Sequence, residues 1–212
     1  MTAVAWVALV LAAVFAVANW VAKATQDKRV EYVAKPATLV SLIVVAATID
    51  PNDEAQRWWF VAALVFSLAG DVLLMLPSDQ FVAGLAAFLV GHVCYVVGFW
   101  LDPPGAVAVV VAAVIVLACV APIAIRILRA LRAGDQREFV GPVAAYIAVI
   151  TAMVVSAGAS GNVVATAGAA LFAGSDSMIA WDRFVRSFPL APVAIMVTYH
   201  LSQALLVLSL LT

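Results

Sequence analysis

Residues 67–95, SLAGDVLLMLPSDQFVAGLAAFLVGHVCY, contain the pattern that decides the fold: two apolar runs separated by a short polar turn. The first run contains an acid, Asp71, and the second a histidine, His92. Similar apolar runs follow one another along the chain with only short polar breaks. Each is close to the roughly 20 residues that a helix needs to cross a bilayer core. The sequence therefore predicts a helical membrane protein in which these two residues are exceptional.

The composition points the same way. Of the 212 residues, 67% are hydrophobic and 11% are charged, and the mean hydropathy is +1.14, values that exclude a soluble domain. We expect one polytopic transmembrane domain over residues 1–212. The first run has no positive segment before it, so we expect a retained helix and not a cleaved signal. Cys94 and Cys119 both lie in apolar runs, which indicates buried thiols and no disulfide.

We predict an all-α protein, because transmembrane strands would alternate apolar and polar residues and these runs do not. Helix 2 is expected to be the shortest and to begin at Lys35-Pro36, since proline is tolerated in a first turn. The eight predicted transmembrane helices cover residues 2–22, 35–49, 57–76, 80–101, 105–128, 139–158, 162–181 and 189–211.

The basic residues predict the orientation. Ten of the eleven Lys and Arg residues fall in odd-numbered connections between these helices, and only Arg57 falls in an even-numbered one. Short cytoplasmic loops carry the excess of positive charge. We therefore expect both termini outside, in a multi-pass protein of the cell (inner) membrane.

The two halves of the chain, residues 1–104 and 105–212, resemble each other at an offset near 106. Pro142 follows Pro36 by 106 residues, Asp176 follows Asp71 by 105, and His200 follows His92 by 108. Because four helices separate the copies, this pattern predicts a parallel repeat of four plus four helices. The alternative is that eight helices of similar spacing align at such an offset by chance.

Asp71 and Asp176 are the strongest candidates for chemistry. Each lies about five residues before the predicted inner end of its helix, roughly 7–9 Å inside the membrane at 1.5 Å per residue. A carboxylate there costs a few kcal/mol, and a helix C-terminus disfavours negative charge. Two neighbouring aspartates that share one proton supply both an acid and a base. The alternative is an interfacial aspartate that reaches water or pairs with a basic residue.

Further polar residues gather by helical spacing on other helices or lie beside the acids in sequence: His92 and Tyr95 share a face of helix 4, and Tyr199, His200 and Gln203 share a face of helix 8. We expect the following residues to bind substrate or support the acids: Lys35, Ser67, His92, Tyr95, Tyr146, Ser175, Tyr199, His200 and Gln203. No pair has the HxxxH or HxxE spacing of metal ligands on one helix, so we predict no metal. All six tryptophans lie near predicted helix ends, where we expect them to anchor the protein at the membrane interface.

Four motifs carry a resemblance to a known family: AGDVLLML in helix 3, GHVCYVVGF in helix 4, FAGSDSMIAWDRF in helix 7 and TYHLSQALL in helix 8, together with the Lys35-Pro36 pair. They resemble the YhhN-like membrane proteins, the family that contains the lysoplasmalogenases. The resemblance implies hydrolysis of the vinyl ether bond of a lysoplasmalogen to a fatty aldehyde and a glycerophospho-headgroup. It assigns catalysis to Asp71 and Asp176 and requires no cofactor. The family often has tyrosine at the position of His200, which counts against a catalytic role there.

The resemblance implies a lysophospholipid substrate within the lipid bilayer and no nucleic acid partner, and it leaves the oligomeric state open. A proton-coupled transporter of small molecules or lipids is the alternative, since buried acids in a repeated bundle also occur there. Against that alternative, both acids lie toward one side of the membrane, whereas alternating access places its site near the midplane.

Overall fold

The computed structural model describes residues 1–78 and 80–212, and within these residues it contains helices and no strands. Eight helices are long and apolar enough to cross a membrane, which confirms the predicted all-α architecture with eight spans. The helices are α1 (Ala3–Thr25), α2 (Lys28–Thr48), α3 (Glu54–Met75), α4 (Phe81–Phe99), α5 (Ala106–Ala133), α6 (Val140–Ala159), α7 (Val163–Phe184) and α8 (Ala191–Leu208). Short 3₁₀ turns occupy Arg137–Phe139 and Ser209–Leu211.

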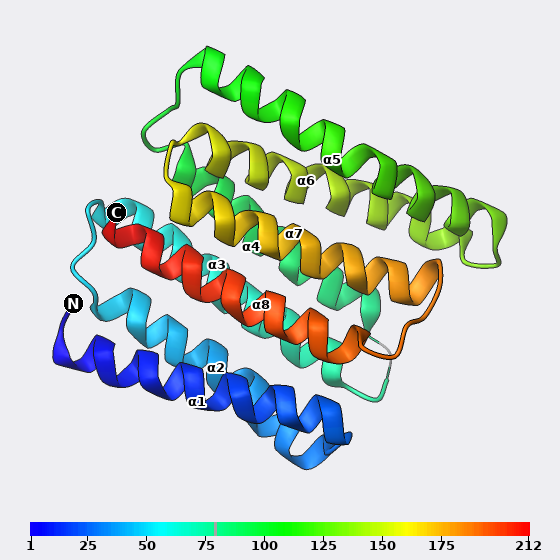
Figure 1. Cartoon of the computed structure of the whole chain (residues 1–212), viewed down its shortest axis with the longest axis horizontal. Helices are drawn as coiled ribbons and strands as arrows, with labels where there is room; N and C mark the ends of the chain where they lie inside the picture. Colours follow the sequence, from blue (N-terminus) through cyan, green and yellow to red (C-terminus); the bar gives the residue numbers. More distant parts are fainter. Residues whose placement is uncertain (79) are drawn as a thin grey trace.

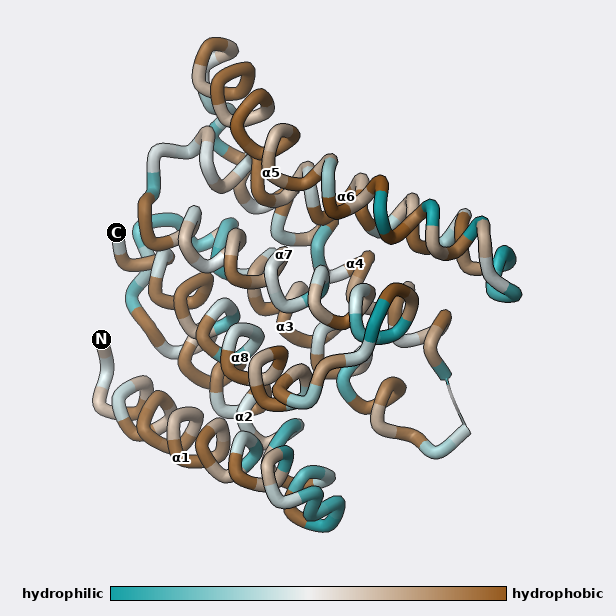
Figure 2. Tube along the Cα trace, turned by 45° about the vertical axis from the view of Figure 1, so that its right-hand side comes forward, coloured by the Kyte–Doolittle hydropathy of each residue, from teal (hydrophilic) through white to brown (hydrophobic). Residues whose placement is uncertain are grey.

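The helices lie side by side along a common direction, with α1 and α2 at one edge of the bundle and α5 at the opposite edge (Figure 1). Consecutive helices pack in pairs, and α8 also packs against α1, α2 and α3. Both termini lie at the same end, where Asn52 Nδ2 donates a hydrogen bond to the Thr212 carbonyl at 3.0 Å. Hydrophilic residues gather at the helix ends, especially where α1 meets α2 and where α5 meets α6, at the end of the bundle opposite the two termini (Figure 2).

The predicted start of the second helix is wrong. α2 begins at Lys28, where the Asp27 side chain accepts hydrogen bonds from the backbone N–H groups of Arg29 and Val30. A helix can continue beyond the apolar residues when a capping side chain binds its first N–H groups and its side chains tolerate helical geometry. The charged segment before Lys35 is therefore also helical. α2 therefore has 21 residues, and the shortest of the eight candidate membrane spans in the described chain is α4 with 19.

Pro36 consequently lies in the interior of α2, as its ninth residue. Having no N–H, it leaves the Tyr32 carbonyl without its usual intrahelical donor. Pro142, by contrast, is the third residue of α6. The two prolines thus occupy different places in their helices, so this pair does not support the internal repeat, which stays a prediction.

Glycines allow α3 and α4 to approach closely. A Cβ atom added at Gly70 would lie 2.5 Å from Phe88 Cδ2, and one at Gly91 would lie 3.0 Å from the Ala63 carbonyl oxygen. Small residues at such positions let membrane helices pack backbone to backbone. This contact fixes the position of Asp71, the residue after Gly70, relative to α4.

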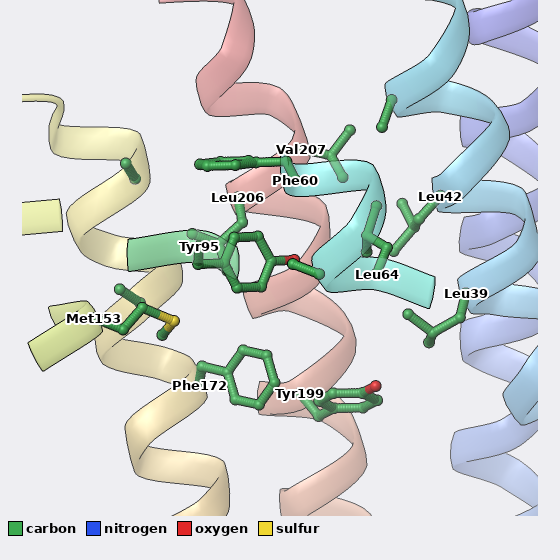
Figure 3. Packing of buried hydrophobic residues seen from close by; sticks show 14 of the residues in the cluster. Leu39, Leu42, Phe60, Leu64, Tyr95, Met153, Phe172, Tyr199, Leu206 and Val207 are labelled. Atoms are coloured by element: carbon green, nitrogen blue, oxygen red, sulfur yellow. The ribbon is translucent and has the colours of Figure 1, made fainter. Parts of the chain in front are cut away.

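The core lies between α2, α3, α4, α6, α7 and α8, where large side chains such as Tyr95, Phe60 and Phe172 are fully buried (Figure 3). α5 is peripheral, because among its described residues only Ile127 and Leu131 are buried.

Candidate active site

Asp71 is the centre of a buried polar cluster that joins α2, α3 and α8. Its side chain is 1% exposed. Lys35 Nζ lies 3.0 Å from Oδ1, and the Tyr199 hydroxyl donates to Oδ2 at 2.8 Å. The carboxylate therefore has one cationic and one neutral donor, which is how proteins compensate the cost of a buried charge.

The cluster continues from Tyr199 toward α4. Gln203 Nε2 donates to the Tyr199 hydroxyl at 3.4 Å, and the Tyr95 hydroxyl donates to Gln203 Oε1 at 2.6 Å. Tyr199 and Gln203 are four residues apart and share one face of α8. The chain of contacts fixes the orientation of Tyr199 and so of the Asp71 carboxylate.

Asp176 is the centre of a second cluster, which joins α4, α6 and α7. The Tyr146 hydroxyl donates to Oδ2 at 2.5 Å, while His92 Nε2 lies 2.8 Å from the Tyr146 oxygen and 3.4 Å from Oδ2. Because Tyr146 has only one hydroxyl proton to donate, we infer that His92 carries its proton on Nε2 and donates to this pair. Asp176 is 14% exposed and forms no ion pair with Lys or Arg within the described chain.

The two clusters are neighbours in the bundle. Phe172 lies between them, with its ring centroid 4.6 Å from that of His92. The Phe172 centroid is 5.4 Å from that of Tyr199, and Figure 3 shows these two rings side by side. Two acids in different surroundings, with an aromatic wall between them, form an arrangement suited to acid/base chemistry on an apolar substrate.

Asp176 faces a cavity. An apolar cavity of about 70 Å³ lies between α4, α5, α6 and α7, and Asp176 and Tyr146 supply polar groups in its wall. Phe88 lines the same cavity. Asp71 is not among the residues that line it. A molecule in the cavity would therefore contact Asp176 directly.

The structure brings eight of the eleven predicted site residues into the two clusters: Asp71, Lys35, Tyr95, Tyr199 and Gln203 in the first, and Asp176, His92 and Tyr146 in the second. It does not bring in Ser67, Ser175 or His200. Ser67 is buried beside Gly91, and the Ser175 hydroxyl donates to the Ile195 carbonyl of α8 at 3.1 Å.

His200 forms no hydrogen bond with either acid, although Tyr199 beside it contacts Asp71. Its Nδ1 accepts a hydrogen bond from Trp20 Nε1 of α1 at 3.1 Å. Sequence neighbours on a helix point in different directions, so the expected common face of Tyr199, His200 and Gln203 is wrong for His200. Trp20 likewise does more than anchor the protein at the interface, because it joins α1 to α8.

Sequence reasoning missed two groups that the structure places at the site. Phe172 separates the two clusters, and Ser177 lines the cavity next to Asp176. Phe172 lies four residues before Asp176, one helical turn away, and this spacing was the available signal. Among residues 1–78 and 80–212, no three His, Cys, Asp or Glu side chains converge as metal ligands would.

Together, the fold and the site define a multi-pass helical membrane protein with two linked acid clusters in its interior. The chain belongs to the YhhN family, whose model matches residues 30–210.

Named relatives are similar over most of this chain. A lysoplasmalogenase, TMEM86B of Mus musculus, is 33% identical over 186 residues, which cover 87% of this chain and 76% of the relative. TMEM86B of Homo sapiens, also named lysoplasmalogenase, is 38% identical over 149 residues, or 69% and 61% of the two chains. A lysoplasmalogenase of Mycobacterium bovis is 33% identical over 181 residues, or 80% and 66%. No solved structure matches the chain.

Proposed function

We propose that this chain is an enzyme that hydrolyses the vinyl ether bond of lysoplasmalogens, within a cell (inner) membrane. The similarity to relatives named lysoplasmalogenase supports the reaction. The observation that carries the mechanism is the different surroundings of the two acids. Asp71 has the Lys35 ammonium 3.0 Å away, whereas Asp176 has no such counter-charge within the described chain and lies in the cavity wall.

In this mechanism Asp176 is the acid and starts protonated. It transfers its proton to the β-carbon of the enol ether, and the lone pair of the ether oxygen completes an oxocarbenium ion. Tyr146 and His92 hold Oδ2 of Asp176, which leaves Oδ1, without a hydrogen bond in the described structure, to carry the proton toward the cavity. Tyr146 and His92 are thus positioning residues.

Water then adds to the oxocarbenium carbon, and the Asp176 carboxylate accepts the proton that the water loses. The resulting hemiacetal collapses to a fatty aldehyde and the glycerol hydroxyl, so the acid is regenerated and no cofactor is consumed. The Asp71 carboxylate, on the other side of Phe172 from the Asp176 cluster, contributes negative charge, and the face of Phe88 in the cavity wall favours positive charge as well. The scheme resembles glycoside hydrolysis, which also uses two carboxyl groups around an oxocarbenium ion.

The test is aldehyde release from lysoplasmalogen by the protein purified in detergent. We expect activity in the wild type, at least a 100-fold loss in Asp176→Asn, and a smaller but clear loss in Asp71→Asn, because general acid catalysis contributes about 10²–10⁴-fold. Asp102→Asn, an exposed loop acid, is the matched control and should be fully active. A wild type that releases no aldehyde rules out the reaction, and an Asp176→Asn variant with normal activity rules out the mechanism.

A further inference from the structure

A second, larger hollow lies on the outside of the bundle between α5 and α7. This α5–α7 groove has a volume of about 870 Å³ and runs from Ile115 of α5 and Thr166 of α7 to the loop after α7. Apolar side chains such as Ile115 and Val116 of α5 and Ala170 and Met178 of α7 form its walls. No acidic residue lines it.

The groove adjoins the cavity at the candidate active site. Val120 and Ile123 of α5 and Ala173 and Ser177 of α7 line both hollows. Ser177 follows Asp176 in the sequence. The residues that separate the groove from the cavity therefore lie directly beside the proposed acid. The cavity, at about 70 Å³, is far smaller than the groove. We therefore expect a long hydrocarbon chain to lie in the groove, with only its ether end reaching the cavity.

The end of the groove beside the loop after α7 is basic. Arg186, in the loop after α7, lines the groove, is exposed and forms no ion pair with any described residue. Its backbone N–H donates to the Trp181 carbonyl at 2.9 Å, and Asp182 Oδ1 accepts from the Phe188 N–H at 3.1 Å, so the loop has a defined shape. Arg126 of α5 lies 6.0 Å from the centroid of the Trp181 ring, which also lines the groove.

We propose that the α5–α7 groove is the lateral entrance and binding site for the lysophospholipid, with Arg186 binding its phosphate; this rests on the proposed function. Along α7 the groove presents an apolar wall near Ala170, the opening to the acid at Ser177, and the arginine beyond Trp181. A lysophospholipid has the same order of groups, namely hydrocarbon chain, ether bond and phosphate. Asp176 lies eight residues before the end of α7, about 12 Å at 1.5 Å per residue, a span that a glycerol phosphate and an arginine side chain bridge together.

α5 has the properties that a movable wall of this groove needs. It is buried at only two described positions, both in its last two turns. Pro122, between the shared wall residues Val120 and Ile123, leaves the Ala118 carbonyl without a helical donor. The same helix therefore combines weak attachment with a built-in bend point where groove and cavity meet.

Cys119 provides a probe of occupancy in the wild-type protein. It lines the groove and is exposed, so the prediction of two buried thiols is wrong for Cys119, because the outer face of α5 is not covered by other helices; Cys94 is buried. The experiment measures the rate at which N-ethylmaleimide alkylates Cys119 in detergent, with and without a 1-O-alkyl lysophospholipid, which has a saturated ether and cannot be hydrolysed. We expect this lipid to slow alkylation about 10-fold, and the corresponding alkylglycerol without phosphate to protect only at much higher concentration.

Two variants test the role of Arg186. Arg186→Ala should require about 10-fold more alkyl lysophospholipid for the same protection, and should raise KM for lysoplasmalogen with kcat unchanged. Arg132→Ala, which removes an exposed arginine near the same end of α5 outside the groove, is the matched control and should behave like the wild type. Equal protection in Arg186→Ala and the wild type would overturn the phosphate assignment.

Aldehyde release, measured in parallel, separates the two proposals. Protection of Cys119 without aldehyde release leaves the groove as a lysophospholipid site and rules out the hydrolase. Aldehyde release without protection by the alkyl lipid rules out the groove and leaves the hydrolase. Protection by the phosphate-free alkylglycerol at equal concentration would mean that the groove binds any single-chain lipid, and would also overturn the proposal.

Discussion

Lys35 and Asp71 show how one ion pair stabilises the interior of this bundle. The ammonium and the carboxylate are 3.0 Å apart, and their side chains are 7% and 1% exposed. Removing one partner of a buried pair leaves an uncompensated charge, which costs far more than the pair itself contributes. Asp71 can therefore be an ionised carboxylate in the buried interior only because Lys35 supplies the opposite charge.

We predict that Lys35→Met lowers the free energy of unfolding by about 3–5 kcal/mol, because Asp71 loses its counter-charge. The measurement is thermal unfolding in detergent. Lys28→Met removes a lysine that is 69% exposed and paired with Glu31, and it should cost at most about 1 kcal/mol. The double variant Lys35→Met/Asp71→Asn should be more stable than Lys35→Met alone. A double variant that is less stable would show that Lys35 acts through some other contact.

The Tyr146 hydroxyl supports a second prediction at this scale. Tyr146→Phe removes the hydrogen bond to Asp176 Oδ2, which becomes a bond to a charged carboxylate as the proton leaves, and hydrogen bonds to charged groups are worth about 1.5–3 kcal/mol. We expect kcat for aldehyde release to fall roughly 10- to 100-fold with little change in KM. Tyr32→Phe is the control, because its hydroxyl contacts the Met75 carbonyl at an exposed position. A kcat that stays unchanged in Tyr146→Phe would remove the proposed positioning role.

At the scale of the helices, the α3–α4 contact depends on Gly70. A Cβ atom there would overlap the Phe88 ring, so Gly70→Ala forces Phe88 to move, and Phe88 also lines the cavity. We expect a loss of about 1–3 kcal/mol in stability, typical of overpacking, together with reduced activity. The measurements are thermal unfolding and aldehyde release.

Gly141→Ala is the matched control, because nothing lies within 4 Å of a Cβ atom at Gly141. A helical position without a clash favours alanine by up to about 1 kcal/mol, so this variant should be neutral or more stable. If Gly70→Ala were as stable as Gly141→Ala, the close approach of α3 and α4 would not matter for stability.

The start of α2 shows why the ends of helices are harder to predict from sequence than their existence. Hydropathy reports only the part of a helix that lies in the membrane. In α2 the apolar run begins after Lys35, whereas the helix begins at Lys28. The Asp27 cap and the ion pairs of Glu31 with Lys23 and Lys28 extend the helix beyond the apolar region. Because the helix starts earlier, Lys35 is a buried residue of the bundle and does not belong to the connection between the first two helices.

At the scale of the whole molecule, the distribution of basic residues predicts the orientation. We expect the α4–α5 connection outside and the α5–α6 connection inside. In a variant without Cys94 and Cys119, a membrane-impermeant thiol reagent on intact cells should label Asp102→Cys, and should label Asp135→Cys only after permeabilisation. The reverse pattern would show that the basic end faces outward.

The candidate site was predictable in part. Acids and a histidine in apolar helices stand out in a sequence, so Asp71, Asp176 and His92 were found. Their partners depend on which helices touch. The sequence does not show that Tyr199 of α8 bonds Asp71, or that His92 of α4 bonds the Asp176 cluster. In each case a residue of the second half of the chain contacts a residue of the first half, as expected if two repeated halves faced each other. The internal repeat itself stays a prediction.

The distance in sequence between Asp71 and its two partners has a consequence for biosynthesis. Lys35 precedes Asp71 by 36 residues, whereas Tyr199 follows it by 128. If the helices insert in chain order, the Lys35 ammonium enters the membrane before α3, and we expect the Asp71 carboxylate to meet its counter-charge as α3 inserts. Tyr199 completes the cluster only when the last helix inserts. The buried Asp71 carboxylate would thus enter the membrane together with the Lys35 ammonium, and insertion of α8 would complete the cluster by adding Tyr199.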